Sequence, residues 1–174
     1  MCVDVLFLTL KQERLMKLKY VDTLIGFQEI PDEISLCINI SNCPNNCPGC
    51  HSPYLAQNIG TELTDSELLR LIEANKGISC VCLMGGDSNP EEINDLAKII
   101  KSKDLKVGWY SGKDILPWEI QLRYFDYVKL GAYIEELGPL NNPTTNQIMF
   151  KIDHFSDRVD VSNITSKFWK DGQH

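Results

Sequence analysis

The sequence has little positive charge, and this argues against one large class of partners. Its 174 residues carry 17 Lys and Arg against 24 Asp and Glu, which gives a formal net charge of -7 at pH 7. Nucleic-acid-binding proteins need a clustered basic face to neutralise phosphates. We therefore expect no nucleic-acid partner, although a ligand the size of a nucleotide remains compatible with this charge.

Long hydrophobic runs, repeats and low-complexity tracts are also missing. No run approaches the length of a membrane span, and the opening MCVDVLFLTL lacks both a basic region and a small-residue cleavage site, so we expect no membrane anchor and no signal peptide. The composition, 43% hydrophobic and 24% charged, is that of an ordinary globular protein. We interpret residues 16–174 as a single domain that begins at an alternative start, Met16, after an N-terminal extension over residues 1–15.

Cysteine is plentiful, but a disulfide framework is not indicated. The count of seven is odd, and Cys2, Cys37, Cys80 and Cys82 lie mostly in apolar runs, where a free cysteine behaves as a small hydrophobe. Cys80 and Cys82 are two residues apart in a strand-like run, so they share one face; we expect them in the core, with contact to a metal cluster as the alternative. Reduced thiols predict a cytoplasmic location.

The other three cysteines form the motif CPNNCPGC, with Cys43, Cys47 and Cys50 spaced as C-x3-C-x2-C. The Pro, Asn and Gly residues between them favour a loop. Three thiolates fill three positions of a [4Fe-4S] cluster and leave one iron open to a non-protein ligand. Zinc with His51 as fourth ligand is the alternative, which the adjacency of His51 to the last cysteine disfavours. The spacing resembles that of the radical S-adenosylmethionine (radical SAM) enzymes.

Apolar strand-like runs alternate with helical patterns after the N-terminal region. We expect strands at residues 34–40, 79–84, 105–110 and 127–130, and helices after Thr64, after Asn89 and around residues 118–124. Such alternation is typical of a parallel sheet with right-handed crossovers. We predict an α/β fold, a partial, open βα barrel of mostly parallel strands of the radical SAM type, followed by a long loop over residues 131–147.

Candidate ligand-binding residues lie where the expected strands end. Gly85, Gly86 and Asp87 follow the second strand, Ser111 follows the third, and Lys129 closes the fourth. The glycines would let a ligand approach the backbone, although a tight strand-to-helix turn is the alternative. In radical SAM enzymes a GGE or GGD segment at this place binds the amino group of S-adenosylmethionine, and the resemblance implies the same role for MGGD here. Lys129 would hold an anionic group of the ligand, or be a solvated surface lysine.

Five motifs extend the resemblance from Lys17 onward. CPNNCPGCHSPYL, MGGD, YSG, DYVKLGAY and GPLNNPTTNQ together resemble the activating proteins of anaerobic (class III) ribonucleotide reductase. This resemblance implies that Cys43, Cys47 and Cys50 bind a [4Fe-4S] cluster, that S-adenosylmethionine is cleaved reductively, and that a glycyl radical forms on the large reductase subunit. Gly49 and His51 would lie against the cofactor. A flavodoxin- or ferredoxin-type protein would supply the electron.

Two other functions remain open from the sequence. One is a small radical SAM enzyme that acts on a small molecule, similar to carboxy-deazaguanine synthase. The other is a non-catalytic metal-binding module, in which the segment from Gly85 to Asp87 is only a turn. Metal analysis separates the second alternative from both enzymes, and co-purification with a large reductase separates the two enzymes from each other.

Overall fold

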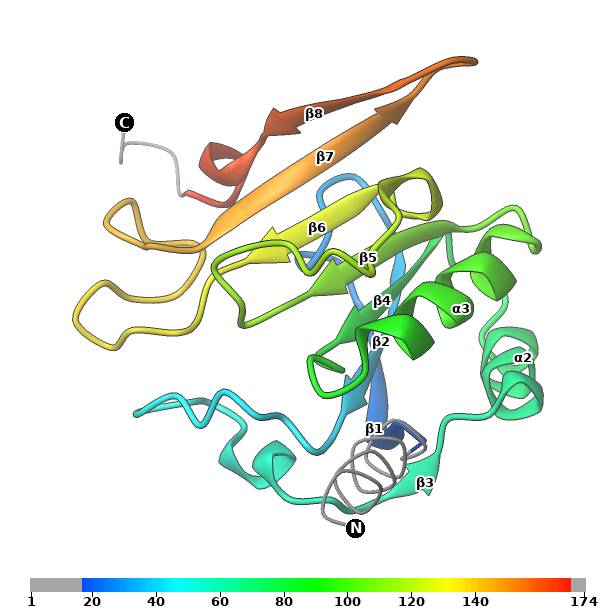
Figure 1. Cartoon of the computed structure of the whole chain (residues 1–174), viewed down its shortest axis with the longest axis horizontal. Helices are drawn as coiled ribbons and strands as arrows, with labels where there is room; N and C mark the ends of the chain where they lie inside the picture. Colours follow the sequence, from blue (N-terminus) through cyan, green and yellow to red (C-terminus); the bar gives the residue numbers. More distant parts are fainter. Residues whose placement is uncertain (1–16, 170–174) are drawn as a thin grey trace, which may run out of the picture.

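One mixed sheet of eight strands organises the chain (Figure 1). The computed structural model describes residues 17–169. The strands are β1 (Lys19–Gly26), β2 (Ser35–Ile40), β3 (Thr61–Glu62), β4 (Cys80–Met84), β5 (Lys106–Tyr110), β6 (Tyr127–Leu130), β7 (Ile148–His154) and β8 (Val159–Asn163), in the sheet order β3-β1-β2-β4-β5-β6-β7-β8. The described helices are α2 (Asp65–Ala74) and α3 (Pro90–Lys101), with short 3-10 helices η1 (Pro53–Ala56), η2 (Leu122–Tyr124) and η3 (Thr165–Phe168). The expected extension, residues 1–15, lies outside the described residues.

The centre of the sheet is parallel. β2 pairs with β4, β4 with β5, and β5 with β6, so these four strands point the same way. Their positions agree with the four expected strands. Because the carboxyl ends of parallel strands meet at one edge, the loops that follow β2, β4, β5 and β6 emerge together. Figure 1 shows the segment after β2 and the long segment after β6 on the same side of the molecule.

The prediction of a partial, open βα barrel of mostly parallel strands, of the radical SAM type, is wrong. β1 is antiparallel to both β2 and β3, and β7 is antiparallel to both β6 and β8, so antiparallel pairings outnumber the parallel ones. Short connections explain two of these directions: residues 27–34 and 155–158 are too few for a crossover, which a parallel return requires. The flanks of the sheet are therefore hairpins rather than βα units.

The helix expected around residues 118–124 is also absent from the described chain. Only η2 forms there, and within residues 17–169 the α-helices number two. Ile120 packs into the core, whereas Ile115 and Trp118 are each 81% exposed, so the segment contacts the sheet through single side chains rather than through a continuous helix face. The connection from β5 to β6 is consequently a loop.

The two helices that do form are capped as expected. The Thr64 side chain accepts a hydrogen bond from Glu67 N at the start of α2, and the Asn89 side chain accepts one from Glu92 N at the start of α3. Both helices bury an apolar face in the core on one side of the sheet, together with Trp109, which is fully buried. Neither helix is long and apolar enough to span a bilayer, and no other helix of residues 17–169 is.

The opposite face of the sheet carries a smaller core. Cys37, Cys80 and Cys82 are buried there and Ile30 and Leu140 pack with them from the connecting loops. The prediction that Cys80 and Cys82 lie in the core is confirmed. Burial raises the pKa of the Cys80 thiol to about 12, so this thiol stays protonated at neutral pH.

Candidate functional site

The cysteine motif forms a loop at the carboxyl end of β2. Two backbone hydrogen bonds hold its start, from Asn42 N to Gln57 O and from Cys43 N to Leu55 O, each 2.9 Å. The left-handed backbone of Gly49, with φ of 72°, suits glycine. These features position all three cysteines at the edge where the parallel strands end.

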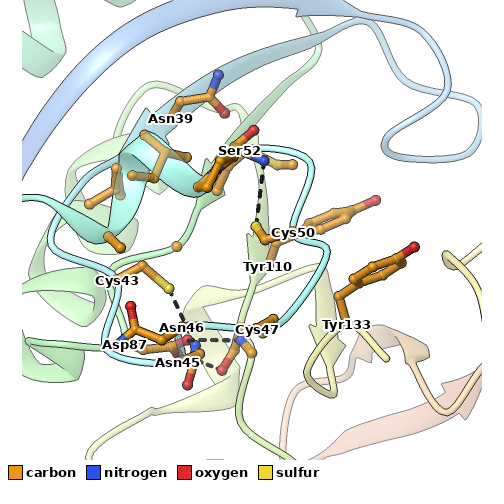
Figure 2. Close-up of a pocket in the computed structure, with 18 of the residues that line it drawn as sticks. Asn39, Cys43, Asn45, Asn46, Cys47, Cys50, Ser52, Asp87, Tyr110 and Tyr133 are labelled. Carbon is orange, nitrogen blue, oxygen red and sulfur yellow. Dashed lines mark hydrogen bonds between the residues drawn. The ribbon is translucent and has the colours of Figure 1, made fainter. Parts of the chain in front are cut away.

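The loop and the strand ends enclose one pocket of about 380 Å³ (Figure 2). Its lining residues are Asn39, Ile40, Cys43, Asn45, Asn46, Cys47, Cys50, Ser52, Pro53, Leu55, Ala56, Met84, Gly85, Asp87, Tyr110, Ser111, Gly112, Lys129 and Tyr133. Residues from the ends of β4, β5 and β6 thus meet the cysteine loop in a single cavity.

Most of the residues selected from the sequence line this pocket. They are Cys43, Cys47, Cys50, Gly85, Asp87, Ser111 and Lys129. Three others do not line it. Gly49 lies against Glu135, whose carboxylate is 3.0 Å from the position of a Cβ on Gly49, and Gly86 lies against Ile93. The exposed His51 ring packs on Tyr133, with ring centroids 5.2 Å apart.

Asp87 is the hydrogen-bonding centre of the pocket. The carboxylate is buried, with 7% of the residue exposed, and it accepts three hydrogen bonds, one from the cysteine loop and two from the segment after β5. Ser111 Oγ donates to Oδ1 at 2.6 Å, while Gly112 N at 2.8 Å and Asn45 Nδ2 at 2.6 Å both donate to Oδ2. A carboxylate can accept about four hydrogen bonds, so one acceptor position on Oδ1 is available to a ligand.

Lys129 places a buried positive charge at the same pocket. Its ammonium donates to Ser111 O at 3.1 Å and Gly131 O at 2.8 Å, and it lies 5.7 Å from the centre of the Tyr110 ring. Burial lowers the pKa of Lys129 to about 8, an effect that Asp87 and the nearby cysteines oppose. The third ammonium hydrogen has no hydrogen-bond acceptor among residues 17–169, so it can meet an anionic ligand group.

The donor set of the loop suits a soft metal centre. Cys43, Cys47 and Cys50 supply three sulfur ligands, which iron–sulfur clusters and zinc both accept. Two of the sulfurs receive hydrogen bonds, from Asn45 Nδ2 to Cys43 Sγ at 3.5 Å and from Ser52 N to Cys50 Sγ at 3.4 Å. In the part of the chain that the structure describes, no three His, Cys, Asp or Glu side chains converge tightly enough to hold a metal ion. His51, turned to Tyr133, does not line the pocket as a zinc ligand would.

The segment TTNQ has a structural role in the long loop after β6. Thr144 Oγ1 donates to Leu137 O at 2.8 Å, Thr145 Oγ1 to Gly138 O at 3.2 Å, and Asn146 Nδ2 to Ala132 O at 2.9 Å. These bonds fold residues 131–147 back on themselves. Tyr133, which follows Ala132, is thereby held beside the pocket.

Asn45, Tyr110 and Tyr133 are among the pocket residues that were not selected from the sequence. Asn45 stands inside the cysteine motif, so its proximity to the sulfurs was a usable signal, whereas its bond to Asp87 spans 42 residues and has no local signature. Trp109 and Tyr110 could not be told apart by composition, but alternation along β5 separates them: Trp109 enters the core and Tyr110 the pocket.

The chain was compared with known protein families, curated proteins and solved structures. No protein-family model, no curated protein and no solved structure matches the chain.

Proposed function

We propose that this chain is a cytoplasmic radical SAM activating enzyme that generates a glycyl radical on an anaerobic ribonucleotide reductase. One observation carries the proposal: the C-x3-C-x2-C loop shares a single pocket with Asp87, Ser111 and Lys129 from the ends of three parallel strands. The sequence motifs support the choice of partner. The proposal depends on the site and not on the fold, because the same chemistry occurs on different scaffolds.

In this proposal Cys43, Cys47 and Cys50 hold a [4Fe-4S] cluster with one iron left open. When bound, the reduced cluster supplies the electron that cleaves the sulfonium of S-adenosylmethionine. The hydrogen bonds that Cys43 and Cys50 accept from the loop orient these sulfurs. A flavodoxin- or ferredoxin-type donor would deliver the electron.

Two charged residues suit the amino-acid end of S-adenosylmethionine. Asp87 Oδ1 has an acceptor position for the ammonium group, and the third hydrogen of the Lys129 ammonium suits the carboxylate. Both groups are buried, with 7% and 8% exposure, so their charges act in a medium that screens them weakly. The two side chains would therefore orient the ligand, with Asp87 at its ammonium group and Lys129 at its carboxylate.

The first test is anaerobic reconstitution of the full chain with iron and sulfide. Low-temperature electron paramagnetic resonance of the dithionite-reduced protein should give a cluster signal that changes when S-adenosylmethionine is added. Cys50→Ala should lose the iron. Cys82→Ala is the matched control: it removes a thiol from the buried core, costs about 1 kcal/mol of stability, and should keep the iron.

Three results would contradict the proposal. One tightly held zinc per chain and no cluster would favour a non-catalytic metal-binding module. A cluster that ignores S-adenosylmethionine would exclude the radical SAM chemistry. A loaded protein that cleaves S-adenosylmethionine but forms no glycyl radical signal on a candidate anaerobic reductase would favour an enzyme acting on a small molecule.

A further inference from the structure

Asn45 joins the cysteine loop to the carboxylate of Asp87. Its Nδ2 lies 2.6 Å from Asp87 Oδ2 and 3.5 Å from Cys43 Sγ. An amide nitrogen has two hydrogens, so both are used, one for a carboxylate and one for a cysteine sulfur. Figure 2 shows the Asn45 side chain close to both partners. One side chain therefore contacts both halves of the site, the metal-binding loop and the ligand-binding carboxylate.

Asn45 occupies the space that a side chain at position 112 would need. A Cβ built on Gly112 would lie 2.2 Å from Asn45 Nδ2, far inside any contact distance. The backbone of Gly112 is outside the left-handed region, so the conformation itself does not demand glycine. Gly112 N also donates to Asp87 Oδ2, the same oxygen that Asn45 contacts. The absence of a side chain at position 112 is thus explained by the place that Asn45 occupies.

We propose that Asn45 is a positioning residue that couples the cysteine loop to Asp87. The inference rests on the proposed function, since it concerns how a loaded cluster and a bound ligand are held. With a cluster loaded, the bond that Asn45 donates to Cys43 Sγ would withdraw electron density from a ligating sulfur, which would favour the reduced cluster and raise its reduction potential. The bond to Asp87 Oδ2 fixes the rotation of the carboxylate and leaves Oδ1 to the ligand.

The test compares four full-length variants with the wild-type protein. Asn45→Ala removes the coupling side chain, Gly112→Ala displaces it, and the double variant does both. Asn75→Ala is the matched control, because its amide donates a bond of 2.8 Å to Leu71 O at the end of α2 and lies outside the pocket. The readouts are the midpoint potential of the reconstituted cluster, calorimetric affinity for S-adenosylmethionine, and amide hydrogen exchange of Gly112 in the metal-free protein.

Asn45→Ala should shift the midpoint potential to a more negative value, weaken S-adenosylmethionine binding about tenfold, and speed the exchange of Gly112 N–H. Gly112→Ala should shift the potential and the affinity in the same direction. The double variant should be no worse than Asn45→Ala alone, because the added methyl then enters vacated space. Asn75→Ala should lower stability and leave potential and affinity unchanged.

Two outcomes measured on the cluster-loaded protein overturn the inference. One is a wild-type potential and affinity in Asn45→Ala; the other is a double variant whose losses equal the sum of the two single variants. If the wild-type chain loads no cluster, the proposed function fails, and hydrogen exchange in the metal-free protein then decides the contact separately. Unchanged exchange of Gly112 in Asn45→Ala would overturn the coupling itself.

Discussion

At the scale of single residues, the pocket is defined by how its buried charges are compensated. Asp87 receives three hydrogen bonds, and Lys129 gives two of its hydrogens to backbone carbonyls. Each group has one position left over, an acceptor on Asp87 and a donor on Lys129. A buried charge is stable only when such partners replace its lost water. The pocket is therefore suited to a ligand that carries both an ammonium and a carboxylate.

Lys129 gives a pH prediction with a definite sign. Its pKa is about 8 in the folded chain, against an ordinary value of 10.5. Between these two values the unfolded chain binds a proton that the folded chain does not, so the unfolding free energy rises with pH. Below about pH 8 both states are protonated and the contribution is constant. The full difference is about 3 kcal/mol, reached above the unfolded pKa.

Lys129→Met removes this titration. We expect the wild-type unfolding free energy to gain about 3 kcal/mol relative to Lys129→Met between about pH 7 and pH 10.5. Denaturant unfolding of the two metal-free proteins at several pH values measures this difference in unfolding free energy. The exposed Lys103→Met controls for the loss of one positive charge. A gap that does not change with pH would show that Lys129 is not a buried cation.

The charged residues of the pocket are recognisable in the sequence, but the hydrogen bonds between them are not. Asp87 follows β4 and Lys129 lies near the end of β6, so the rule that sites lie at the carboxyl ends of parallel strands was sufficient to select them. Asn45 was not selected, because its role depends on contacts with Asp87 and Gly112, which are distant in the chain. Gly49 and His51 were selected for adjacency to Cys50 and Gly86 as a member of MGGD, and position in a motif does not fix which way a residue faces.

At the scale of elements, local pattern predicted the centre of the sheet and not its flanks. The strands that became β2, β4, β5 and β6 are mostly apolar and mostly buried, as central parallel strands should be. Strand direction has no local signature; it follows from the length of the connection. The capping residues predicted α2 and α3, whereas the segment before η2 has apolar residues at helical spacing but no capping residue directly before Pro117, and the helix inferred from that spacing is wrong.

The loop over residues 131–147 gives a prediction at this scale. Asn146 Nδ2 bonds Ala132 O, and Asn146 Oδ1 accepts no hydrogen bond among residues 17–169. Asn146→Ala should cost about 1 kcal/mol and speed hydrogen exchange in residues 131–146 while leaving β4 protected. Asn141→Ala, at an exposed amide of the same loop, is the control. Equal exchange in the two variants would contradict the role given to Asn146.

At the scale of the whole molecule, one sheet runs through both hairpin flanks and the parallel centre. Its two faces carry separate cores, one under the helices and a smaller one beneath the connecting loops. Tyr127 and Met149 of the smaller core lie on β6 and β7, so that core crosses from the parallel centre to the antiparallel flank. No boundary separates the centre from the flanks among residues 17–169, which indicates one cooperative unit.

We therefore expect a single unfolding transition for the metal-free chain. Far-ultraviolet circular dichroism, which reports the strands and helices, should give the same midpoint as near-ultraviolet dichroism, which reports aromatic packing. The protection of amide hydrogens from exchange should be lost at the same denaturant concentration in β1, β4 and β7. Two separated transitions, with one flank unfolding before the centre, would contradict this expectation.

The placement of the described cysteines, on buried strands or in the loop after β2, also decides their chemical accessibility. Cys37, Cys80 and Cys82 are sealed between the sheet and its connecting loops, whereas Cys43, Cys47 and Cys50 are partly exposed in their loop. A thiol reagent added to the folded metal-free chain would therefore modify the loop and spare the core. The metal-binding thiols are thus addressable by probe or crosslinker without replacing a single core cysteine.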